Sequence, residues 1–382
     1  MKKLLCIILI LLFSLLNIQN VNAIDSINLD EIYKEQYEIS GAKDLMDKIP
    51  NDAQNTLDNL GIEVDDWNTL MNLTPNKIFS ELMETVRKQL PSPLQAGLSI
   101  LAVMLLCALL EGMKLSFGER PLSGVVGAIS TLCISITVIL QIVKTIEHTA
   151  TVVRNSADFM LVYIPVMAGI MIASGQTVSA ISYHMMMVFA GDIISQIAAK
   201  LLVPLLNIFL AFSVVSSISP RMNLSGICKN ISSIVKWTLG FVMSVFVSLL
   251  TVQSVVGCSA DDMGLKTIKF AISSFVPVVG GALSDAFSTV RGCVKLLKSG
   301  VGAFGILAGL VIFLPVIVKC LLWMLSLGLC ASVGDVFELK QISELLRSVS
   351  RVVSTMLAIV LCSMTILTIS TVLVLIIGGG VN

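Results

Sequence analysis

The sequence predicts an all-α, polytopic helical membrane protein, and three observations lead to that fold class. Of its 382 residues, 55% are apolar and only 13% are charged. The mean hydropathy is +0.93. A soluble fold of this length could not bury so much apolar surface, so part of the chain must face lipid. The third observation is a series of long apolar runs separated by short polar stretches. Together they exclude a water-soluble enzyme, a coiled coil and a disordered chain.

The first 93 residues predict a leader and an extracytoplasmic segment. Lys2 and Lys3 precede an apolar core, and Val21-Asn22-Ala23 forms a small-residue cleavage site, so residues 1–23 are predicted to be a signal peptide. An uncleaved first membrane helix is the alternative. Residues 24–93 carry six basic and fourteen acidic residues, a net charge of −8. This acidic segment is predicted to be helical, with a helix starting at Thr74-Pro75.

Residues 94–143 are predicted to form two transmembrane helices, at 94–110 and 122–143. The remainder is predicted to contain an internal parallel repeat, with one copy at 158–257 and the second at 268–377. Tyr163-Ile164-Pro165-Val166 matches Phe275-Val276-Pro277-Val278, and 231–236 matches 342–347 at nearly the same offset. The run at 300–313 is too short to cross alone, which suggests a half-helix or a re-entrant hairpin. Eight to ten crossings are therefore expected.

Charge then predicts the orientation of these helices. With 24–93 outside, the predicted inner loops carry 11 of the 17 basic residues found after residue 93, as the positive-inside rule requires. Those loops are 111–121, 175–181, 220–236, 285–299 and 338–351. No basic face for nucleic acid remains beyond them.

Proline, glycine and aspartate at membrane depth mark the candidate site. Helices interrupted by proline or adjacent glycines expose peptide groups, which are tolerated only in protein or beside water. Ionisable groups in lipid are energetically costly, so they often have a function. The alternative is that the aspartates lie at the membrane interface and that the prolines and glycines serve only helix packing. The candidate pore, gate or packing residues are Pro165, Gly169, Asp192, Pro277, Gly280, Gly281, Asp285, Gly305 and Gly309.

Basic residues of the inner loops are candidates for contact with a cytosolic partner. Their alternative role is simply to set the orientation of the chain. The candidates are Arg291, Lys295, Lys298, Arg347 and Arg351.

No metal, cofactor or catalytic group is predicted. The nine cysteines contain no CxxC pair, and His148 and His184 are isolated histidines. The glycine-rich stretches lack the lysine and the serine or threonine of a phosphate-binding loop.

The stretch from Phe275 to Asp285, continuing through Gly292-Cys293 and Lys298 to Gly302, resembles the signature region of the stage III sporulation protein AE family. The region around 163–166, with Ala173-Ser174-Gly175, is similar to that family as well. The resemblance implies an endospore-forming bacterium and a multi-pass protein of the mother-cell membrane that surrounds the forespore. It further implies a non-enzymatic component of a channel that supports forespore development after engulfment. The implied partners are a secretion-type ATPase, ring-forming proteins and other stage III membrane proteins, with a homo-oligomer also possible.

Two other functions fit the sequence. Duplicated halves with helices broken at matching positions are typical of a self-sufficient secondary transporter for a small solute. A membrane-embedded enzyme is the third reading, but the sequence offers it no paired carboxylates. A transporter should move solute when reconstituted alone, whereas a channel subunit should be inert alone and co-purify with partners.

Overall fold

A computed structural model describes residues 29–62, 74–117, 122–196, 203–218, 225–275 and 280–376, and within these ranges every regular element is a helix. Some side chains inside the helices, including all of those at 110–117 and 280–291, lie outside the description. The predicted all-α class with long apolar helices is confirmed.

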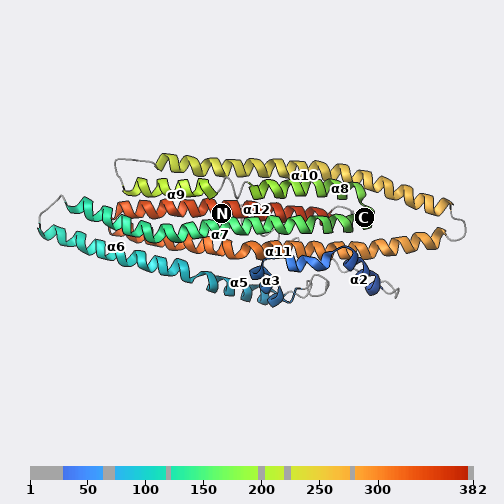
Figure 1. Ribbon diagram of the computed structural model, residues 1–382, viewed down its shortest axis with the longest axis horizontal. Helices are drawn as coiled ribbons and strands as arrows, with labels where there is room; N and C mark the ends of the chain where they lie inside the picture. The colour runs from blue at the N-terminus through green and yellow to red at the C-terminus, as the bar shows by residue number, and fades with distance from the viewer. Residues whose placement is uncertain are drawn as a thin grey trace.

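The N-terminal segment forms short amphipathic helices that lie along one side of a long bundle (Figure 1). The last of them begins at Pro75 with Thr74 as its N-cap, as the sequence predicts. On its exposed face Lys88 Nζ lies 2.8 Å from Glu84 Oε1, and this hydrogen bond lowers the pKa of Glu84. The helices are α2 (Leu29–Ile39), η1 (Ala42–Lys48), α3 (Asn51–Leu60) and α5 (Pro75–Gln89).

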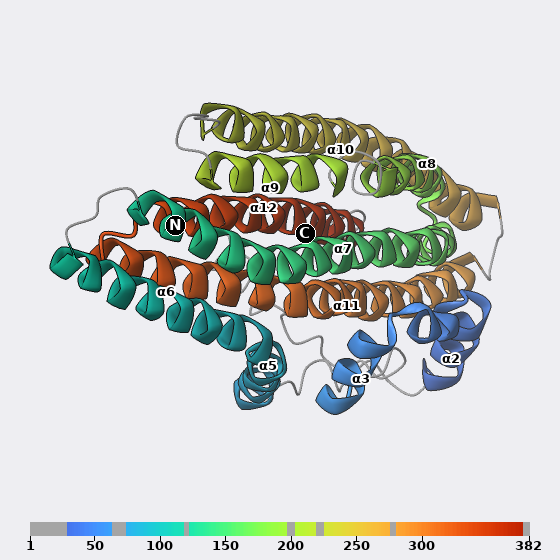
Figure 2. The same cartoon turned by 60° about the vertical axis from the view of Figure 1, so that its left-hand side comes forward.

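Seven further helices build the bundle, in which successive long helices run in opposite directions (Figures 1 and 2). Helices α8 and α9 lie end to end beside α10, and α11 and α12 pack along each other in the interior. Their bounds are α6 (Pro91–Phe117), α7 (Leu122–Ala173), α8 (Thr177–Gln196), α9 (Val203–Ile218), α10 (Ser225–Phe275), α11 (Gly280–Val336) and α12 (Lys340–Ile376).

Glycine sets the spacing of the central helices. A Cβ added to Gly302 would lie 2.5 Å from Leu375 of α12, and one added to Gly305 would lie 2.5 Å from the ring of Tyr163 in α7. Gly309 is similarly crowded by Leu367. Small residues allow close helix approach where lipid provides no hydrophobic drive. Gly305 and Gly309, which form a GxxxG pair and are among the predicted pore, gate or packing residues, therefore pack within the chain.

Five helices of the described residues are long and apolar enough to cross a membrane, fewer than the eight to ten crossings expected. They lie at Pro91–Leu109, Ile129–Ala173, Gly226–Gln253, Gly292–Val336 and Lys340–Ile376, and a shorter apolar helix covers Pro204–Ser216. The number is lower because segments predicted to be separate helices are joined in continuous helices. The 300–313 run, predicted to be a separate half-helix, is part of the 57-residue α11, which continues through Pro315. Likewise α7 continues through Pro165. Both prolines therefore lie inside helices that continue past them.

The predicted orientation is wrong for two loops. The C-terminal end of α6, the C-terminal end of α9 and the α11–α12 turn lie at one end of the bundle, whereas the α7–α8 turn and the start of α11 lie at the other (Figure 1). Loops 175–181 and 285–299 therefore cannot share a side with 111–121, 220–236 and 338–351. The error follows from ending one predicted crossing at 143 and beginning another at 158, and from counting 300–313 as a separate element, because α7 and α11 continue through these places.

The internal repeat stays a prediction. Helices α8 and α9 run in the direction of α11, and α10 runs in the direction of α12 (Figure 1). The interruptions differ, however, because the turn after Ala173 falls where α11 is continuous in the second copy.

Candidate functional site

The turn between α7 and α8 is held by backbone bonds that only a left-handed residue permits. Gly175 has φ +81°. Its N–H donates to Ile172 O at 2.9 Å, and the Gln176 N–H donates to Met171 O at 2.9 Å. This is the Schellman arrangement, in which glycine after the last helical turn satisfies carbonyls that would otherwise lack donors. The chain therefore turns at Ser174–Gln176, at the start of the predicted loop 175–181, whereas α7 continues through Pro165.

A carboxylate from another helix caps the beginning of α8. Asp261 of α10 is 6% exposed. Its Oδ1 accepts the Val178 N–H at 2.9 Å, and its Oδ2 accepts the Ser179 N–H at 3.0 Å. The first N–H groups of a helix have no partner within the helix and carry partial positive charge, so a carboxylate is favoured there.

A buried ammonium group reaches the same turn from α11. Lys298 Nζ donates a hydrogen bond of 2.9 Å to Gln176 Oε1, and both residues are 4% exposed. Charges removed from water are costly unless polar partners hold them. We call Gln176, Ser179, Asp261 and Lys298 the turn cluster, because it ties α8, α10 and α11 to the end of α7.

Close packing surrounds the turn cluster. A Cβ added to Gly257 of α10 would lie 2.7 Å from Ser179 Oγ and 3.2 Å from Ser179 Cα. The Ser179 hydroxyl is itself buried without a hydrogen-bond partner in the structure. No group of three His, Cys, Asp or Glu side chains within the described ranges is placed to bind a metal. The arrangement can anchor a helix junction, because Asp261 of α10 and Lys298 of α11 each hydrogen-bond to the turn between α7 and α8.

The structure separates the predicted site residues. Pro165 and Gly169 are exposed on α7, so they do not line its packed side. Gly280 and Gly281 open α11, while Asp192 and Asp285 lie within α8 and α11 with side chains outside the description. Pro277 lies outside the described residues.

The predicted basic contacts differ among themselves. Lys295 is exposed, and Arg347 is exposed in an ion pair with Asp335. Arg351 is partly buried and donates to Ser348 Oγ at 2.7 Å. Lys298 is buried and bonded to Gln176, so its contact with a cytosolic partner stays a prediction that its position in the chain interior does not support. Arg291 lies in α11 with its side chain outside the description.

Sequence reasoning missed Asp261 and Gln176. Asp261 falls between the two predicted copies and was left without a role there. The available signal was Gly257 followed by Asp261 four residues later, which puts a small residue and a carboxylate on one helix face.

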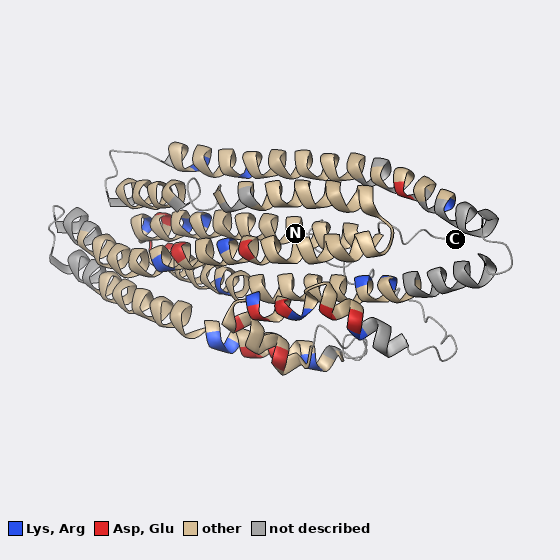
Figure 3. Cartoon of the chain, turned by 45° about the vertical axis from the view of Figure 1, so that its right-hand side comes forward, with Lys and Arg blue, Asp and Glu red and all other residues tan. Residues whose placement is uncertain are grey.

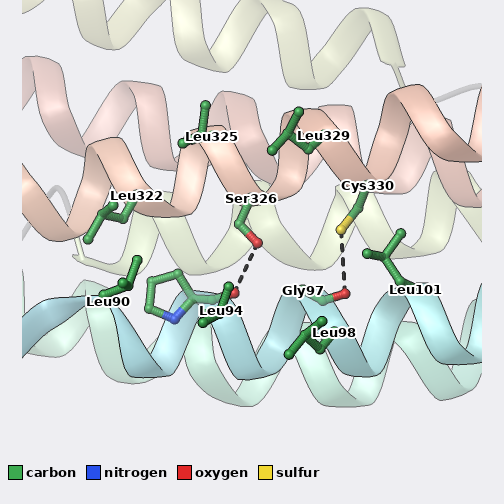
Figure 4. A pocket seen from close by; sticks show the side chains of 11 residues that line it. Leu90, Leu94, Gly97, Leu98, Leu101, Leu322, Leu325, Ser326, Leu329 and Cys330 are labelled. Carbon is green, nitrogen blue, oxygen red and sulfur yellow. Dashed lines mark hydrogen bonds between the residues drawn. The ribbon is translucent and has the colours of Figure 1, made fainter. Parts of the chain in front are cut away.

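An apolar pocket of about 160 Å³ lies between α6 and α11 (Figure 4). Ser326 Oγ donates to Pro93 O at 2.9 Å, and Cys330 Sγ donates to Gly97 O at 3.6 Å. Leucines supply most of the remaining lining. With no charged group in its wall, the pocket suits an acyl chain or helix packing better than a polar substrate.

Comparisons with known proteins identify the family. The family model for stage III sporulation protein AE matches residues 64–379. Stage III sporulation protein AE of Bacillus subtilis (strain 168) is 23% identical over 208 residues, which cover 54% of this chain and 52% of that relative. The match thus spans about half the length of the curated relative. No solved structure matches. The chain belongs to the stage III sporulation protein AE family.

Proposed function

We propose that this protein is the non-enzymatic, multispanning membrane component of a sporulation channel that links the mother cell and the forespore. The observation that carries the proposal is the family match over residues 64–379, combined with five long apolar helices in the same region. Family membership gives a role in sporulation, and the helices give a membrane protein. The proposal goes beyond these two findings by assigning the protein to a channel and to the mother-cell membrane around the forespore.

Two features of the bundle support a subunit that works in a complex. A buried carboxylate, Asp261, and a buried ammonium group, Lys298, both hold the turn between α7 and α8, where several helices join. Exposed basic residues, Lys295 and Arg347, remain available to partners on opposite ends of the bundle. The proposed partners are a secretion-type ATPase, ring-forming proteins and other stage III membrane proteins, together with further copies of the chain.

The test is deletion in the source organism, with sporulation scored by stage. We expect arrest after engulfment and restoration by the intact chain. The same tagged chain, isolated from sporulating cells, should co-purify with an ATPase and membrane proteins that are absent from vegetative cells. Normal spore yield after deletion would overturn the proposal. Solute uptake by vesicles containing only this chain would favour the secondary transporter instead.

A further inference from the structure

One face of α7 changes from apolar to charged partway along the helix. Leu140 is 61% exposed, and the same face continues with Lys144, Glu147, Arg154 and Asp158, all exposed. Intervals of three, seven and four residues keep these side chains on a single side of a helix. We call the four charged residues the α7 ridge.

Contacts through the central helices fix the depth of the α7 ridge relative to α10. Helices α7, α10 and α12 run in one direction, and α11 runs in the other (Figure 1). At a rise of 1.5 Å per residue, these contacts put Arg154 and Asp158 within about one turn of the level of Phe241 and Val245. The contacts are Gly305 against Tyr163, Gly309 against Leu367, and Ser232 Oγ at 3.0 Å from Thr355 Oγ1.

At that level the outer face of α10 is apolar. Phe241 is 58% exposed and Val245 is 42% exposed. Trp237 stacks on Phe241 with ring centroids 5.7 Å apart. A largely unburied, apolar helix face of this kind is suited to lipid, and it belongs to one of the candidate membrane spans.

The α7 side of the bundle also carries charge about 12 Å beyond the α7 ridge, at the level of Val166. Helix η1 packs on α7, and a Cβ added to Gly41 would lie 3.8 Å from Val166 Cγ2. While Leu45 of η1 is buried, Asp44 and Asp47 are exposed. Acidic and basic side chains therefore gather on the helices lying over α7 and α11, whereas α10 is almost free of charge along most of its length (Figure 3).

We infer that the α7 ridge lines a water-filled path through the membrane, while the α10 face at the same depth meets lipid. A charged side chain facing acyl chains is strongly disfavoured, and polar surface at membrane depth borders protein or a wet cavity. The inference rests on the proposed channel function and assigns its water-facing side. A bundle with one lipid face and one wet face at a single depth is the form that a pore-lining subunit requires.

The test compares cysteines placed on the two faces in the full chain. A functional cysteine-free background first replaces the native thiols, including the exposed Cys133. Arg154→Cys and Asp158→Cys report on the α7 ridge, and Phe241→Cys and Val245→Cys are their matched controls within about one turn of the same depth. Membranes from sporulating cells, opened to both sides, are treated with a membrane-impermeant charged maleimide.

We expect the ridge cysteines to react at least roughly tenfold faster than the α10 cysteines, because a thiol in hydrocarbon does not ionise. Equal, rapid labelling on both faces would place this whole level in bulk water and overturn the inference. Slow labelling on both faces would overturn it as well. Labelling after unfolding in detergent shows that every cysteine is present. Sporulation of the cysteine variants is scored separately. A wrong proposal for the function is therefore distinguished from a wrong assignment of the water-facing side.

Discussion

Lys298 of α11 donates a hydrogen bond of 2.9 Å to Gln176 in the turn between α7 and α8, and both side chains are almost completely buried. The two residues are separated by 122 positions in the chain, so the bond joins the two halves of the membrane region. Lys298, which the sequence predicts to lie in the inner loop 285–299, is therefore part of the protein interior.

Lys298→Met should destabilise the protein, because it leaves the buried Gln176 amide oxygen without its donor. A buried polar group left unpaired costs about 1–3 kcal/mol. Thermal unfolding in detergent measures the loss, with the exposed Lys295→Met as the matched control. Adding Gln176→Leu should recover part of the loss, since two apolar side chains can pack where one unpaired polar group cannot. Equal stability of the two single variants would contradict the buried bond.

Asp261→Leu should loosen the start of α8. The substitution removes the acceptor of two backbone N–H groups, and the expected cost is about 1–3 kcal/mol or more because the acceptor is charged. The control is Asp335→Leu, which removes an exposed ion pair worth about 0–1 kcal/mol. Hydrogen exchange at Val178 and Ser179 is the local measurement. Unchanged protection there would show that Asp261 is not the cap.

Gly305→Ala should disturb the contact between α11 and α7, because the added methyl group would overlap the Tyr163 ring. Overpacking of this kind costs about 1–3 kcal/mol. Gly240→Ala of α10 is the control, since open space surrounds that position, and there alanine should stabilise the helix by up to about 1 kcal/mol. The two melting temperatures should move in opposite directions. The contact is refuted if both rise.

Gly280→Leu or Gly281→Leu should block assembly or sporulation while the protein still inserts into the membrane. Both glycines lie at the start of α11, directly after the four residues that separate it from α10. Membrane fractionation checks insertion, and heat-resistant spore counts check function. Normal spore yield from both variants would remove this stretch from the functional region.

The sequence predicts features that depend on adjacent residues well, but it predicts poorly which helices pack against each other. The helix at Pro75 follows from the capping preference of threonine and the fixed φ of proline, which are properties of adjacent residues. The sequence predicts an interruption at Pro165 and a separate element at 300–313, yet α7 and α11 continue through both places. The predicted GxxxG pair does pack closely, but only the structure identifies Tyr163 and Leu367 as its partners.

Composition and hydropathy alone determine that this chain is a helical membrane protein, because lipid forces every backbone polar group to be satisfied within helices. Its glycine- and proline-rich motifs are sufficient for the family resemblance. Tertiary structure alone decides which charges are buried and which form the α7 ridge. That decision depends on the register of helices a hundred or more residues apart, where a shift of one turn exchanges the residues that face lipid, water and protein.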